Sequence, residues 1–136
     1  MLVLNPRQVK FGNTVWDDVV LVAVDRAASR VVEEWSDLGP YAAFGDVPEQ
    51  RITIRVVQEL ARDDLDGPGP GDLAELTLHT SPGWSEGGRR KLAARAMVTR
   101  VEHEVSLKRG AVRTVTLLAI SEDGAEDPVA VTAGGG

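Results

Sequence analysis

Hydrophobic and polar residues alternate along most of this chain with a period of two, which is typical of β-strands. Near the start, two short alternating runs flank Gly12-Asn13, a pair that suits a tight hairpin turn. Turn residues bound the later runs, so the pattern predicts strands over residues 18–26, 31–36, 51–60, 73–80, 89–106 and 111–121. Residues 90–97 contain good helix formers, but the alternation over 98–105 favours one long strand with room for a bulge.

Helix and loop signals are sparse. Residues 37–50 contain Gly39, Pro40, Gly45 and Pro48, which predict a long loop. Any short helix is expected around residues 58–65, before a run rich in Asp, Gly and Pro. The closing glycines predict a flexible tail over residues 129–136. The pattern therefore predicts one mainly β domain over residues 1–136, an antiparallel sandwich or barrel with at most one short helix.

Composition narrows the class of protein. The chain has 136 residues, of which 43% are hydrophobic and 26% charged, and this suits one folded domain. It has no cysteine, which excludes disulfides and thiolate chemistry. No apolar stretch approaches the roughly 20 residues of a membrane span, and the first residues do not resemble a signal peptide. The net charge of −6 predicts overall repulsion of nucleic acid.

One motif suggests catalysis, but the partner residues that it requires are not evident. Residues 83–87 match the G-x-S-x-G pattern around a nucleophilic serine, here Ser85. The one later histidine is His103, and its neighbour Glu102 points to the opposite face of a strand, so no orienting acid is evident. A glycine-rich turn explains the motif better, and we expect the protein not to be an enzyme.

Metal and nucleic-acid motifs are equally weak. The acidic residues of 63–66 lack the first and last ligands of a calcium loop. His79 and His103 fall short of a three-ligand zinc site. The basic run at 89–91 has no interleaved aromatic residues. We therefore expect no metal, no cofactor and no specific nucleic-acid site.

Aromatic residues gather in and beside the expected loop at 37–50. Loops run over protein surfaces, so a loop this apolar either folds back over its own core or exposes a binding patch. The sequence leaves both interpretations open. The residues concerned are Trp35, Leu38, Tyr41, Phe44 and Val47.

Taken in order, the segments resemble the tail tube proteins of long-tailed bacteriophages and related contractile or gene-transfer particles. The resemblance covers nearly the whole chain. It rests on the hairpin at 11–13, the loop at 37–50 with the strand that follows, and the succession of 96–101, 111–121 and 121–128.

The resemblance implies a structural virion protein, made in the host bacterial cytoplasm. Its subunits would join into hexameric rings that stack into the tail tube, the conduit for genome ejection. Partners would be further copies and other tail proteins, such as the terminator, baseplate or tape measure, with no membrane. DNA would pass through without specific binding.

Two sets of residues receive roles from this interpretation. The five apolar residues of the expected loop are predicted to contact neighbouring subunits or rings. Arg100, Glu102 and Glu104 share one face of the long strand at 89–106 and are the candidates to face the lumen. An acidic excess suits a bore through which DNA slides, because it prevents multiple phosphate contacts.

Two other functions fit the same pattern. One is a tube protein of the type VI secretion kind, which has a similar fold and also stacks as hexamers. The other is a monomeric β-barrel binding module whose ligand docks at the aromatic loop. Self-association distinguishes the module from both tube proteins.

Overall fold

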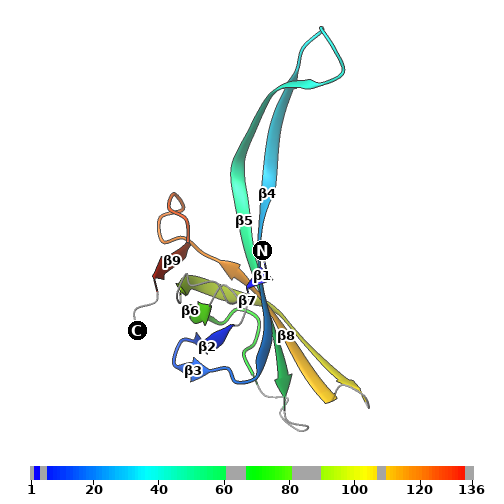
Figure 1. Cartoon of the computed structure of the whole chain (residues 1–136). Coiled ribbons are helices and arrows are strands. Elements are labelled where there is room, and N and C mark those ends of the chain that lie inside the picture. The colour runs from blue at the N-terminus through cyan, green and yellow to red at the C-terminus, as the bar shows by residue number, and fades with distance from the viewer. Residues whose placement is uncertain (1, 4–5, 61–66, 81–89, 107–109, 134–136) are drawn as a thin grey trace.

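The structure is a computed structural model that describes residues 2–3, 6–60, 67–80, 90–106 and 110–133. These residues form nine strands and no helix (Figure 1). The strands are β1 (Leu2–Val3), β2 (Arg7–Phe11), β3 (Thr14–Val15), β4 (Val19–Trp35), β5 (Ala42–Leu60), β6 (Leu73–Thr80), β7 (Arg90–Ser106), β8 (Gly110–Ala119) and β9 (Val129–Ala133). The chain is all-β, as its alternation predicted.

All strand pairs are antiparallel and belong to one sheet, in the order β1-β4-β5-β8-β7-β6-β2-β3, with β9 also paired to β7. Long β7 joins two layers. Its second half pairs with β8, while its first half lies between β6 and β9, and a register shift between Val98 and Arg100 separates the halves. We call β1, β4, β5, β8 and residues 98–106 the first layer. The second layer contains β9, residues 90–97, β6, β2 and β3.

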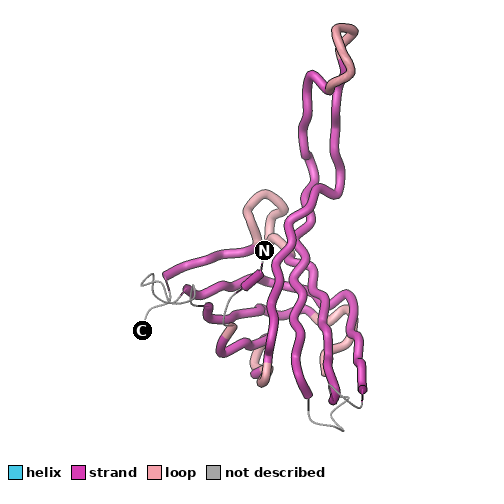
Figure 2. Tube along the Cα trace, turned by 45° about the vertical axis from the view of Figure 1, so that its right-hand side comes forward, coloured by secondary structure: helices cyan, strands magenta, loops and turns pink. Residues whose placement is uncertain are grey.

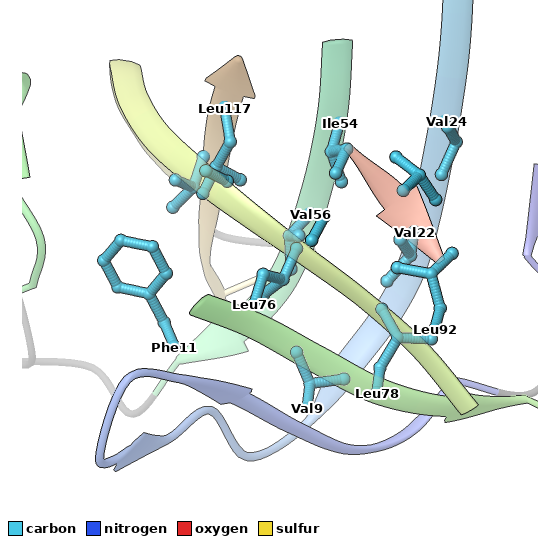
Figure 3. Packing of buried hydrophobic residues seen from close by; sticks show 14 of the residues in the cluster. Val9, Phe11, Val22, Val24, Ile54, Val56, Leu76, Leu78, Leu92 and Leu117 are labelled. Carbon is cyan, nitrogen blue, oxygen red and sulfur yellow. The ribbon is translucent and has the colours of Figure 1, made fainter. Parts of the chain in front are cut away.

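The two layers face each other across one hydrophobic core (Figure 3). Alternate residues of each strand point inward, among them Val22 and Ile54 of the first layer and Leu76, Leu78 and Leu92 of the second, all at most 1% exposed. Within the described residues the sheet does not close into a barrel, because β1 and β3 at its ends do not pair with each other. The result is an open, curled sheet around a sandwich-like core.

The prediction of a long loop at 37–50 is wrong. Strand β5 begins at Ala42, so the connection from β4 spans only residues 36–41, and the strands expected at 18–26 and 31–36 are one continuous β4. Gly45 and Pro48, which suggested a loop, lie within strand β5. Pro48 lies where the pairing shifts, between the pairs Arg30–Glu49 and Val32–Asp46. Proline has no backbone N–H to donate, but at a bulge on a strand with a free edge no partner requires that donor.

Four other expectations can be compared with the structure. Gly12 turns between β2 and β3 with a φ of 62°, and Leu73–Thr80 is a strand as predicted. Residues 58–60, where a helix was expected to begin, are strand, and 61–65 lie outside the described residues. Residues 129–133 form β9 in place of a flexible tail, because they continue the edge of β7 that β8 leaves at Ala96. Residues 134–136 lie outside the described residues.

Candidate functional site

The outer part of the β4–β5 hairpin projects from the body as a two-stranded arm, residues 27–50 (Figures 1 and 2). Apart from half-buried Val32, every residue of the arm is exposed. From Ala27 to Trp35 the arm extends about 30 Å, at the usual rise of a strand. A lone two-stranded ribbon is at best marginally stable in water. The arm is thus the part of the subunit that most needs a partner.

Apolar side chains gather towards the tip of this arm. Leu38 and Tyr41 are 97% and 81% exposed, and Trp35 is 61% exposed. Phe44 and Val47 follow on β5 at 52% and 41%. All five predicted contact residues therefore lie together on one projecting element, on a hairpin and its turn rather than on a long loop. Of the two interpretations that the sequence left open, the exposed patch is the one observed.

The arm is also acidic. It has a net charge of −4, from five carboxylates against the single guanidinium of Arg30. The carboxylates are Glu33, Glu34, Asp37, Asp46 and Glu49. Among the described residues the ion pairs of the subunit are Arg26–Asp127 and Arg100–Glu102, so none of the five is neutralised there. The tip therefore combines exposed aromatic rings with uncompensated negative charge.

The segment between β8 and β9 braces the base of the arm. The Asp127 carboxylate lies 3.0 Å from the Arg26 guanidinium and accepts the backbone N–H of Val129. The accepted hydrogen bond, helped by Arg26, lowers the pKa of Asp127 below its ordinary value. Asp123 accepts the N–H groups of Ala125 and Glu126, and these bonds lower its pKa as well. The body thus holds the root of the arm while the outer part stays uncovered.

The first layer has a second face, turned away from the core, on which the three lumen candidates lie. Arg100 pairs with Thr116 and Glu102 with Thr114, and residues opposite each other in antiparallel strands share a face. Glu104 lies one step further along β7, opposite Val112. The Arg100 guanidinium is 2.6 Å from the Glu102 carboxylate. All three candidates are exposed on one sheet face.

This open face extends across four strands. Its rows run Ala23–Arg55–Thr116–Arg100 and Leu21–Val57–Thr114–Glu102, from β4 to β7. Threonine and apolar residues lie among charged residues on this face. Between the row of Asp25 and that of Glu104 the face has four carboxylates against two guanidinium groups. These are Asp25, Glu59, Glu102 and Glu104, with Arg55 and Arg100.

Both borders of the first layer have unpaired lengths of strand. At one border β1 pairs with Val22 and Ala23, and residues 19–21 and 25–35 of β4 have no second strand beside them among the described residues. At the other, residues 99–105 of β7 pair with β8 on one side and with no described strand on the other, whereas the backbone of Val98 is hydrogen-bonded to Gly71 and Asp72. Free edges present rows of N–H and C=O groups that another strand can satisfy.

A buried polar cluster, which sequence analysis missed, lies between the layers. The Arg113 guanidinium donates to the Gln58 side-chain oxygen and lies over the Trp16 ring, 5.9 Å from its centre. Gln58 donates in turn to the backbone oxygen of Asp17. Trp16 stacks on Phe11 with ring centres 5.2 Å apart. Arg113 is 4% exposed, and these contacts hold its guanidinium group between the layers. Its place within an alternating strand gave no sign of burial.

The other motifs of the sequence lie partly outside the described residues. The G-x-S-x-G motif and the acidic run at 63–66 lie outside the described residues. His79 is half-buried on β6, while His103 is exposed on the second half of β7. No group of three or more potential metal ligands occurs in the described part of the chain. None of its segments is a helix long and apolar enough to cross a membrane.

Neither a scan against protein-family models nor a search of curated proteins finds a match for this sequence.

Proposed function

We propose that this protein is the subunit of a phage-type tail tube, a structural protein that assembles into stacked hexameric rings. The observation that carries the proposal is the arm. It projects from a well-packed body with its apolar tip exposed, and nothing in the described subunit covers it. Such patches mark surfaces that other proteins cover.

The first layer supports the closed ring. Its free edges lie at opposite borders, on residues 19–21 and 25–35 of β4 and on residues 99–105 of β7. When the second edge of one subunit pairs with the first edge of the next, the contact is head-to-tail, and a rotation that closes makes a ring. Closure satisfies the exposed backbone groups and removes the aggregation hazard of open edges. The joined first layers then form a continuous inner barrel.

In this arrangement the open face of the first layer lines the bore. Arg100, Glu102 and Glu104 lie on that face, and its four carboxylates outnumber its two guanidinium groups. Ring symmetry repeats this bias on every subunit. The fields of like charges add within a channel with low-dielectric walls, so DNA is held centred and slides without being bound.

Tube proteins of type VI secretion would use the same arm, edges and ring, so the geometry supports both kinds of tube. A monomeric binding module needs only the arm and leaves both edges of the first layer unused. The module and the tube differ in a simple observable, the mass of the protein in solution.

Light scattering of the purified protein, over a range of protein and salt concentrations, tests the proposal. We expect the mass to rise with concentration from the subunit to hexameric rings and longer stacks. A mass that stays at 14.6 kDa throughout, with no tubes in negative stain, would contradict it.

A further inference from the structure

The outer face of the second layer is basic, although the protein as a whole is acidic. Arg7 pairs with His79 and His79 with Lys91, so these three form one cross-strand row from β2 through β6 to β7. Lys10 lies in the next row, opposite Thr77, and Arg95 lies opposite Glu75. We call the four exposed cations, Arg7, Lys10, Lys91 and Arg95, with the residues between them, the basic face.

The charges of this face are not neutralised within the described subunit. Both ion pairs of the described residues lie elsewhere, and the one carboxylate among the four cations is Glu75. His79 and small residues lie between the cations. Thr77, Ala93 and Ala130 lie side by side across three strands. The face is therefore a floor of small residues with cations around it.

Charge decides which surface of another copy suits the acidic arm. Two arms, each with a net charge of −4, repel each other. The open face of the first layer also has an excess of carboxylates. Of the sheet faces in the described chain, only the basic face has an excess of positive charge. It offers opposite charge at its rim and small residues at its centre, which matches an apolar tip with carboxylates around it.

We propose that the arm of one subunit docks on the basic face of another copy. The proposal rests on the proposed self-assembly and names the surface that receives the arm. Trp35, Tyr41 and Phe44 lie on the floor of small residues, where Lys and Arg side chains also stack on aromatic rings. Glu34, which lies opposite Phe44 and so shares its face of the arm, meets the cations of the rim. Such a contact is head-to-tail, so it adds one subunit after another and suits the growth of a stack.

Charge reversal on each side tests this pairing. One full-length variant, Glu33→Lys/Glu34→Lys, reverses the arm, and a second, Lys91→Glu/Arg95→Glu, reverses the face. A third carries all four substitutions. The matched control is Glu122→Lys/Glu126→Lys, two exposed residues of the segment between β8 and β9, which changes the net charge by as much as the arm variant. Circular dichroism and thermal melts establish that each variant folds, and light scattering measures the concentration at which assembly begins.

We expect each reversal alone to raise that concentration about tenfold or more at low salt, because like charges then oppose at the joint. Opposite charges meet again at every joint in the variant with all four substitutions and in an equal mixture of the two reversal variants. Both should therefore assemble at nearly the wild-type concentration. The control also assembles normally. Added salt weakens wild-type assembly and narrows the differences between variants.

Two results overturn the proposal. If the wild type assembles but neither the mixture nor the variant with all four substitutions regains the wild-type assembly concentration, the arm docks elsewhere, although the tube remains. If a short DNA duplex binds the wild type and Lys91→Glu/Arg95→Glu abolishes that binding without affecting assembly, the basic face belongs to nucleic acid. Failure of the wild type to assemble under any condition contradicts the proposed function itself, so the two failures are distinct.

Discussion

Replacement of the two aromatic rings near the tip, Tyr41→Ser/Phe44→Ser, tests the arm as the joint between subunits. Both side chains are exposed and make no contribution to the core, so the variant subunit is expected to fold as the wild type does. Assembly, in contrast, loses two of its largest apolar contacts. The variant therefore separates the stability of the subunit from the affinity of subunits for one another.

The size of the effect follows from the exposed fractions. An aromatic side chain presents about 200 Å², so at 81% and 52% exposure the pair offers about 260 Å² to a partner. If docking removes half of this area from water, at about 25 cal/mol per Å², the contact is stabilised by about 3 kcal/mol. That free energy corresponds to about a hundredfold in the association constant of each joint.

Light scattering against protein concentration measures the threshold for assembly. We expect that threshold to rise about a hundredfold for the variant. The control is Val131→Ser on β9, at a position of the body outside the proposed joints where the side chain is 50% exposed, and it should leave the threshold nearly unchanged. A double variant that folds and assembles at the wild-type concentration refutes the assignment of the arm as a joint.

The remaining predictions concern the bore, the core and the base of the arm. Glu102→Lys/Glu104→Lys should leave tubes intact but make them retain DNA at low salt, with retention in a pull-down falling as salt rises. Leu76→Ala, at a site with no exposed surface, should lower the free energy of unfolding by about 3 kcal/mol in urea titrations, whereas Leu73→Ala on the same strand should cost less than about 1 kcal/mol. Since the folded pKa of Asp127 is lowered, its contribution is present at neutral pH and disappears as pH falls through that value. Asp127→Asn should thus lose less than about 1 kcal/mol at neutral pH and nothing in acid.

The body of the fold was predictable because one face of each strand is buried there. Residues 73–80 alternate between core and surface, and the strand has the predicted bounds. Arg90–Ser106 is one strand with a register shift, as the change of pattern suggested. The arm was not predictable in this way. Both of its faces meet solvent, so its residues follow no hydrophobic period, and Gly45 and Pro48 looked like loop residues.

Prediction of the candidate surfaces depended on whether their residues are neighbours in sequence. The aromatic cluster at 35–47 and the polar face of Arg100, Glu102 and Glu104 each lie on one continuous segment, so local patterns revealed them. The basic face joins β2 with β7 through β6, and its cations come together only through the order of strands in the sheet. From the sequence, only the short basic run at 89–91 was visible.

Electron cryomicroscopy of the concentrated protein tests the central claim most directly. We expect stacked hexameric rings around a bore lined by β4, β5, β8 and the second half of β7, with the arm of each subunit against another copy. Particles that remain single subunits at every concentration, or assemblies in which these strands form no continuous inner wall, would contradict the account.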